Sequence, residues 1–400
     1  MVNMINTNHL NDRGRKMDTV EELADIARAR PENLKKEKEK GVKIVGYTGR
    51  FVPEELIYAA GAIPYLICKG GETAPVEEVL PYMLRFMSPY ARAQIGYHLL
   101  KMDPVIPMLD LVVADCSDCH MARLADLFEY FKLPTVRIGI PPDWEKSLSY
   151  NYYYKGLTKL RNKLEILTGS KISEKKLREA TDSLNKIRSL LRNISELRKR
   201  QPPPIGGYDY IRLNHCSFYG DLKEITGKLD DVYHRLKEGK SPFLKEAPRI
   251  LLAGHVISVG DYILPKLIES SGGVVVAEFL DEGNRQCQWE VNTKGDLVKN
   301  IADMYYLTRV PPSIFQPAWE KRLTFMKKLI GDFKIDGVIW YQLSFEEIYD
   351  MEGSIVSKAM GEMKIPFLKL ESSYEYAREA MGPLTTRVES FIESIRVKRG

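Results

Sequence analysis

The sequence predicts an α/β protein in which a helical connector joins two domains, each built on a parallel four-stranded sheet. Two sets of four short, β-branched runs lie in the two halves of the 400-residue chain, and helical patterns separate the runs within each set. Apolar strands of this length that alternate with helices are typical of parallel sheets covered on both faces. A chain of this length is also too long for one compact core. We therefore expect two similar domains rather than one extended sheet.

The first half of the chain is expected to contain an N-terminal segment and one α/β domain. Residues 1–42 are polar, and their pattern predicts a tail followed by a helix that ends near Gly41. The first domain is predicted over 43–143, with strands at 43–49, 63–69, 109–116 and 134–141. Helical patterns between these runs give the β-α order that a parallel sheet requires.

The second half repeats this arrangement after the connector. Residues 144–245 form the predicted connector, where apolar residues recur at helical spacing until "QPPPIGG" ends the helix, since proline lacks an N–H and glycine is conformationally free. We expect a helical hairpin in this connector. The second domain is predicted over 246–400, with strands at 249–256, 273–280, 336–343 and 366–371.

Charge and hydropathy exclude several classes of protein. The 59 basic and 54 acidic residues give a net charge of +5 that is spread along the chain, so no nucleic-acid-binding surface is indicated. No apolar run reaches the length of about 18 residues that a membrane span requires, so no membrane association is expected. The polar N-terminal segment lacks the apolar part of a secretion signal, which predicts a cytoplasmic protein.

The stretch "LVVADCSDCHMARLADLF" holds the most distinctive of the five cysteines, a number that does not indicate a disulfide framework. Cys116 and Cys119 stand three residues apart where a predicted strand ends, with His120 beside them. The spacing fits a redox pair, part of an iron–sulfur ligand set, or two buried or capping residues without a metal. Structural zinc is not indicated, because no second ligand pair is present. The residue pattern leaves the three interpretations open.

Polar residues follow the third strand of each predicted domain. His120 and the two cysteines follow it in the first domain, and Glu346 and Glu347 follow it in the second. Ligands of open α/β sheets bind beyond the carboxyl ends of the strands. We therefore expect the two clusters to face each other across one cleft.

The remaining signals favour structural roles. Cys68, Cys216 and Cys287 stand alone and are interpreted as buried thiols. The glycine-bearing turns match neither common nucleotide-binding pattern, so the chain is not expected to hydrolyse a nucleotide. Glu54 and Glu55 open a predicted helix after a proline, where acidic residues commonly complement the helix dipole.

Several segments nevertheless resemble one enzyme family. "VPEELIYAAGAIPYLI" is similar to the opening motif of the 2-hydroxyacyl-CoA dehydratase and benzoyl-CoA reductase subunits, roughly P-x-E-L-I-x-A-A-G-x-x-P. Four further segments resemble the same family in the same order: "LPYMLRFMSPYARAQIG", "LDLVVADCSDCHMARLADLF", "RILLAGHVISVGDYILPKLIESSGGVVVAEFLDEGNR" and "MGPLTTRVESFIESI". The resemblance covers most of the chain, from about residue 43 to the C-terminus.

The resemblance implies Rossmann-like or flavodoxin-like domains and a heterodimer with a second, homologous subunit. It also implies a 4Fe-4S cluster that three cysteines hold with one iron open, and a separate ATP-dependent iron–sulfur activator that supplies an electron. The implied substrate is an acyl-CoA thioester, whose oxygen coordinates the open iron while the thioester accepts the electron as a ketyl radical. The product then forms by loss of water or by ring reduction.

The resemblance also suggests two residues for substrate contact. Glu55 matches the glutamate of the opening motif and is predicted to orient the substrate hydroxyl or to move a proton. Arg50 lies just before this helix and is predicted to contact a CoA phosphate, because a guanidinium pairs bidentately with phosphate.

The sequence departs from the family at the expected cluster ligands. Ser88 stands at the first cysteine position and Glu346 at the third, while Cys119 or Cys116 matches the second. We predict Cys119 as the principal metal ligand and Cys116 as a second one, with the N–H groups of the following helix stabilising a thiolate. With Glu346 as an oxygen ligand, this set would hold a modified cluster.

Two other outcomes follow from the same departure. Either the subunit has lost its cluster, or Cys68 or Cys287 completes the ligand set. The predicted function is therefore a subunit of an iron–sulfur 2-hydroxyacyl-CoA dehydratase or of the related benzoyl-CoA reductase. The alternative is a non-catalytic, cluster-less member that binds a partner. The sequence carries no local signature for the acyl group, since acyl pockets form from scattered side chains.

Overall fold

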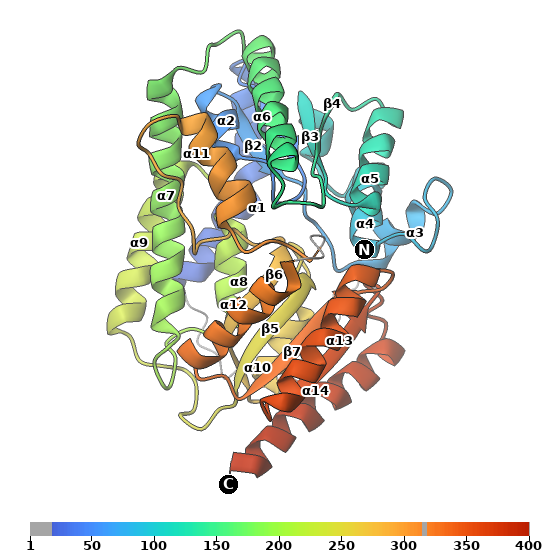
Figure 1. Ribbon diagram of the computed structural model, residues 1–400, viewed down its shortest axis with the longest axis vertical. Coiled ribbons are helices and arrows are strands. Elements are labelled where there is room, and N and C mark those ends of the chain that lie inside the picture. The colour runs from blue at the N-terminus through green and yellow to red at the C-terminus, as the bar shows by residue number, and fades with distance from the viewer. Residues whose placement is uncertain (1–17, 314–317, 400) are drawn as a thin grey trace.

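The computed structural model describes residues 18–313 and 318–399, and Figure 1 shows an upper and a lower α/β unit. Each unit contains a four-stranded sheet, and every strand pair in both sheets is parallel. The strand orders are β2-β1-β3-β4 and β6-β5-β7-β8, so the two sheets have the same topology. This order is that of flavodoxin-like sheets, which confirms the predicted fold class. The expected tail over residues 1–17 lies outside the described residues.

The strands of the first sheet lie at four of the predicted β-branched runs: β1 (Ile44–Tyr47), β2 (Ile63–Leu66), β3 (Leu111–Cys116) and β4 (Thr135–Gly139). Short helices connect them: α2 (Glu54–Ala59), α3 (Thr73–Glu78), α4 (Pro89–Leu99), the 3-10 turn η1 (Ile106–Met108) and α5 (Cys119–Tyr130). The β1 strand and the first five residues of β3 are buried, because helices cover both faces of the sheet.

The strands of the second sheet lie at the other four runs: β5 (Arg249–Val256), β6 (Val274–Glu282), β7 (Gly337–Leu343) and β8 (Phe367–Ser372). Its helices are α10 (Ile263–Ser270), α11 (Leu297–Ala302), the π-helix η2 (Asp303–Thr308), α12 (Trp319–Asp332), α13 (Glu347–Glu362) and α14 (Arg378–Arg399). Every residue of β5 and β7 is buried, as expected for the central strands of a covered sheet.

The connector is helical, as predicted, and α1 packs with it. Its helices are α6 (Ser147–Thr168), α7 (Glu174–Leu197), α8 (Gly207–Cys216) and α9 (Leu222–Glu238), and α1 covers Asp18–Glu39. The chain turns between α6 and α7 at Gly169, whose φ of 66° is left-handed. The two consecutive helices α6 and α7 do not pack chiefly on each other as a hairpin would: α7 packs mainly against α9 and α2, and α6 against α11 and β4.

The two sheets belong to one packed body. One cluster of buried side chains contains residues of both sheets, including Val113 and Ile339. A parallel backbone bridge joins Lys69, after β2, to Val259, after β5. The strands fall within the predicted domain limits of 43–143 and 246–400, and the limits themselves stay a prediction. Among residues 18–313 and 318–399, no helix has the combination of length and apolar composition that a bilayer crossing demands.

Candidate functional site

A polar pocket lies between the two domains, at the carboxyl ends of both sheets. Phe51 follows β1 and Ser117 follows β3 in the first domain. His255 lies in β5 and Glu346 follows β7 in the second domain. In each sheet these two strands flank the point where the strand order reverses, which is where doubly wound sheets bind ligands. We call this space the interdomain pocket; its other lining residues are Ser88, Tyr90, Asp118, His120, Met121, Glu282, Pro312 and Tyr349.

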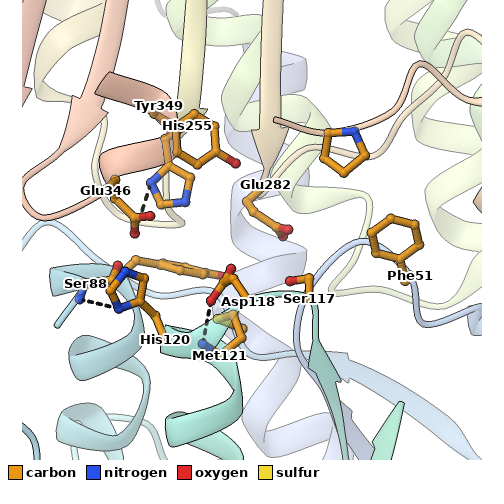
Figure 2. Close-up of a pocket in the computed structure, with 12 residues that line it drawn as sticks. Phe51, Ser88, Ser117, Asp118, His120, Met121, His255, Glu282, Glu346 and Tyr349 are labelled. Atoms are coloured by element: carbon orange, nitrogen blue, oxygen red, sulfur yellow. Dashed lines mark hydrogen bonds and ion pairs between the residues drawn. The ribbon is translucent and has the colours of Figure 1, made fainter. Parts of the chain in front are cut away.

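The first domain contributes the start of α5 to this pocket. The Asp118 carboxylate accepts a hydrogen bond of 2.8 Å from the Met121 N–H and thereby caps the helix. This cap fixes the turn that directs His120 toward the second domain in Figure 2. The His120 Nδ1 atom accepts a bond of 3.3 Å from the N–H of Ser88, the residue that caps α4. Two helix starts are therefore joined at one wall of the pocket.

The second domain contributes the opposite wall. Nδ1 of His255 lies 3.6 Å from Oε1 of Glu346, and Figure 2 shows both side chains above Ser88 and His120. The Tyr349 ring lies against the His255 ring, with 4.3 Å between the centroids. Nε2 of His120 lies 3.8 Å from Oε2 of Glu347. The clusters after the third strands thus face each other, as the sequence predicted.

Burial sets the protonation of the groups in this pocket. Burial, together with the charge of Asp118, raises the pKa of Glu346 well above its usual range. Burial lowers the pKa of His255 to about 3. Burial also raises the pKa of Glu282, and the nearby Asp115 carboxylate adds to that effect. Burial therefore favours the uncharged form of both Glu346 and His255, a carboxyl that can donate a hydrogen bond and an imidazole that can accept one.

The two predicted cysteine ligands lie beside the pocket rather than in its lining. Cys116 ends β3, and its Sγ contacts the Ala114 carbonyl at 3.9 Å. Cys119 begins α5 and is exposed. Burial raises the pKa of the Cys116 thiol to about 11 and that of Cys119 above its ordinary value, and neighbouring aspartates act in the same direction. Burial and the neighbouring carboxylates thus outweigh the stabilisation of a thiolate that was expected at the helix start, and they favour the neutral thiols.

Glu55 lies in a different place, inside a buried ion pair. Its Oε1 atom accepts a bond of 2.7 Å from Arg188 of α7, and its Oε2 atom accepts one of 2.9 Å from the Tyr305 hydroxyl. Burial acts to raise its pKa, but the Arg188 charge and these hydrogen bonds hold it below its ordinary value. Glu55 therefore joins α2 to the connector, and its predicted contact with substrate stays a prediction.

Arg50 lines a second pocket, which adjoins the interdomain pocket at Glu282. Its guanidinium pairs with Asp281 at 3.3 Å and donates to the Val310 carbonyl at 3.0 Å. The predicted contact with a CoA phosphate stays a prediction.

A family model described as 2-hydroxyglutaryl-CoA dehydratase, D-component, matches residues 50–395. The chain belongs to this dehydratase D-component family. The match confirms the resemblance that its sequence segments indicated.

Several proteins are similar over nearly the whole chain. A putative dehydratase subunit of Escherichia coli, YjiM, is 26% identical over 362 residues, covering 90% of this chain and 93% of that protein. A subunit of the benzoyl-CoA reductase of Thauera aromatica is 25% identical, with coverage of 90% and 93%. The beta subunit of the (R)-2-hydroxyglutaryl-CoA dehydratase of Acidaminococcus fermentans is 21% identical, with coverage of 94% and 98%. The relatives are thus subunits of dehydratases and of a reductase, and two of their names specify an acyl-CoA.

The donor set of this family member does not fit a cluster held by three thiolates. Ser88 and Glu346, which stand at two of the three expected cysteine positions, line the interdomain pocket. At the third position it is His120, next to Cys119 in the sequence, that lines the pocket. The side chains that meet there offer hydroxyl, imidazole and carboxyl donors, which are harder than the thiolates that iron–sulfur clusters prefer. Within the described part of the chain, no three His, Cys, Asp or Glu side chains are grouped as a metal ion would need.

Sequence reasoning missed His255, Glu282 and Tyr349 as pocket residues. His255 is the next-to-last residue of β5 and Glu282 is the last residue of β6, at the edge where the sheet binds ligands. A polar residue at the end of an apolar strand was therefore an available signal for both. Tyr349 lies in the first turn of α13 and carries no comparable signal, because its position depends on how the helix packs.

Proposed function

We propose that the chain is a subunit of a 2-hydroxyacyl-CoA dehydratase or benzoyl-CoA reductase-like complex, paired with a second, homologous subunit and served by an ATP-dependent iron–sulfur activator. In this proposal the interdomain pocket receives the acyl thioester, and the iron–sulfur cluster belongs to the homologous subunit. The observation that carries it is the convergence of Ser88, His120 and Glu346, without a cysteine among the described lining residues, at one pocket. Family membership supports the substrate class.

The protonation states in the pocket support a role in the dehydration branch of this chemistry. Loss of water from a 2-hydroxyacyl group needs a proton for the departing hydroxyl and an acceptor for the proton of the neighbouring carbon. A protonated Glu346 is a donor, and the neutral His255 imidazole is an acceptor. Both side chains are over nine-tenths buried, so water competes weakly for them.

Glu55 and Arg50 enter the proposal in different ways. Both carboxylate oxygens of Glu55 are already engaged by Arg188 and Tyr305, which favours a positioning role for Glu55. Arg50 lines the pocket next to the proposed thioester position, which supports contact with an anionic part of the acyl-CoA.

A second candidate is the predicted cluster held by Cys116, Cys119 and Glu346. It is favoured by one observation: Ser117 and Asp118, between the two cysteines, line the same pocket as Glu346. A loop movement that turned both sulfurs inward would bring the three groups to one side of the pocket.

Anaerobic purification of the complex of both subunits distinguishes these candidates. Iron and acid-labile sulfide are measured in wild-type complex and in complex that carries Cys116→Ser and Cys119→Ser together. We expect the same iron content in both complexes and turnover of an acyl-CoA by the wild type. A loss of one cluster in the double variant supports the second candidate, whereas absence of both complex formation and acyl-CoA turnover contradicts the proposed function.

A further inference from the structure

Four buried arginines line the pocket that adjoins the interdomain pocket: Arg50, Arg188, Arg285 and Arg309. We call it the arginine pocket. Arg50 follows β1, Arg188 comes from α7, and Arg285 and Arg309 follow β6 and η2. Glu282 lines both pockets, so the arginine pocket lies one side chain away from the proposed position of the thioester.

Three of these arginines have a carboxylate partner. Arg50 pairs with Asp281 at 3.3 Å and Arg188 with Glu55 at 2.7 Å. Arg285 pairs with Glu54. These pairs offset the cost of burying the three cations.

Arg309 is the exception within the described residues, where it has no ion pair. Its NH1 donates 2.8 Å to the Arg50 carbonyl, and its Nε donates 3.3 Å to the Met304 sulfur. The guanidinium lies 3.9 Å from the centroid of the Tyr305 ring. Burial lowers the pKa of Arg309 to about 10, a value at which the group stays charged at neutral pH. A buried charge without a charged partner is costly, which makes a pocket that keeps one a candidate for ligand binding.

Two of the arginines that line the pocket also carry an unused donor. The Nε atoms of Arg50 and Arg188 are buried and, in the described part of the chain, have no hydrogen-bond partner. Glu282 offsets the positive charge of the pocket only weakly, because burial and the nearby Asp115 raise its pKa and favour its uncharged form, although Arg50 acts in the opposite direction. The pocket therefore combines an uncompensated positive charge with spare N–H donors, and this combination is complementary to a small oxyanion.

We propose that the arginine pocket binds an oxyanion of the acyl-CoA substrate, with the Arg309 guanidinium as its principal partner. The identity of the ligand as an acyl-CoA rests on the proposed function; the anion site itself does not. This oxyanion is a carboxylate or a phosphate group, both of which pair with a guanidinium through their oxygen atoms. The carboxylate would be the far end of a dicarboxylic acyl chain, and the phosphate would belong to CoA.

Binding to the purified chain alone tests the anion site without any turnover. The probes are glutarate and pyrophosphate, measured by isothermal titration calorimetry at low ionic strength. We expect at least one probe to bind the wild type and Arg309→Gln to weaken that binding at least 10-fold, while Arg309→Lys weakens it less. Arg85→Gln, which removes an exposed arginine, is the matched control and should bind as the wild type does. Equal binding by wild type and Arg309→Gln, or no binding of either probe, overturns the proposal.

The two probes also distinguish the sources of the oxyanion. Binding of glutarate alone assigns the acyl carboxylate, and binding of pyrophosphate alone assigns the CoA phosphate. If both bind, glutaryl-CoA and butyryl-CoA are compared: selective loss of glutaryl-CoA binding in Arg309→Gln assigns the carboxylate, and equal loss for both assigns the phosphate.

The folded state of the variant is checked by its thermal unfolding midpoint. Because Arg309 carries no ion pair in the described residues, we expect the midpoint of ligand-free Arg309→Gln to equal or exceed that of the wild type. The effective probe should raise the midpoint of the wild type and leave that of Arg309→Gln unchanged. A variant that unfolds at a much lower temperature in the absence of probe, together with a wild type that no probe stabilises, assigns Arg309 a structural role instead.

Discussion

The imidazole of His255, at the end of β5, lies 3.6 Å from the carboxyl group of Glu346, at the start of α13. These two elements lie far apart in the sequence of the second domain, and the fold brings a proton acceptor from one close to a proton donor from the other. Burial shifts their pKa values in opposite directions, since it favours the uncharged form of each. This pair is the chemical centre of the proposed site.

Glu346→Gln should lower kcat of the reconstituted complex by about 100-fold, because glutamine keeps the shape but has no acidic proton. KM should change little, since the amide can still accept hydrogen bonds from the substrate. Steady-state kinetics with the preferred acyl-CoA measure both constants. Glu362→Gln, at the exposed end of the same helix, is the matched control. Unchanged turnover in Glu346→Gln would remove Glu346 from the proposed chemistry.

Glu55→Gln should destabilise the chain by about 2–4 kcal/mol, because it leaves the buried Arg188 cation without its carboxylate. Urea unfolding gives the free energy of unfolding. Glu196→Gln breaks an exposed ion pair with Lys199 and should cost at most about 0.5 kcal/mol. A Glu55→Gln variant that is as stable as the wild type but inactive would favour substrate contact over the positioning role.

Gly96→Ala should destabilise the first domain by about 2 kcal/mol or more, because the added methyl group would overlap the Pro75 backbone. An ideal Cβ at Gly96 lies 1.8 Å from the Pro75 carbonyl oxygen, where α4 crosses α3. Gly227→Ala in α9 meets no atom within 4 Å and should instead stabilise by about 0.5–1 kcal/mol. Thermal unfolding of the two variants checks these opposite signs. Equal midpoints would show that α3 and α4 adjust without cost.

Asp261→Asn should reduce the loss of stability that accompanies rising pH. Burial raises the pKa of Asp261 to about 6, although hydrogen bonds from Tyr376 and Tyr341 oppose this. Below about pH 4 the carboxyl is protonated in both states; between about pH 4 and 6 the unfolded chain releases its proton first, so unfolding becomes easier as pH rises. Relative to Asp261→Asn, the wild type should lose about 2 kcal/mol between about pH 4.5 and 7.5. Parallel stability curves for the two proteins over this range would contradict the prediction.

Local sequence patterns determined the fold class. Eight β-branched runs alternating with helical patterns predicted both parallel sheets, because period and residue type act within a few residues of each other. The same logic identified the family segments and the meeting of the two clusters after the third strands. Sequence patterns failed for the helical hairpin that was expected in the connector, because α7 packs chiefly on α9 and α2. Helical periodicity shows which face of a helix is apolar but not which element covers that face.

Only the tertiary structure decided which side chains occupy the site. Glu55 matched a family motif, yet its carboxylate is buried against Arg188 from a helix more than one hundred residues later. His255 and Arg309 gained their character from burial, because the same imidazole or guanidinium in water would have an ordinary pKa. Sequence patterns record local geometry and apolar faces, whereas burial and pairing of charges arise only when distant elements come together. For this chain the sequence determined the sheets and the family, and tertiary packing decided the pair of His255 and Glu346 and left Arg309 without an ion pair among residues 18–313 and 318–399.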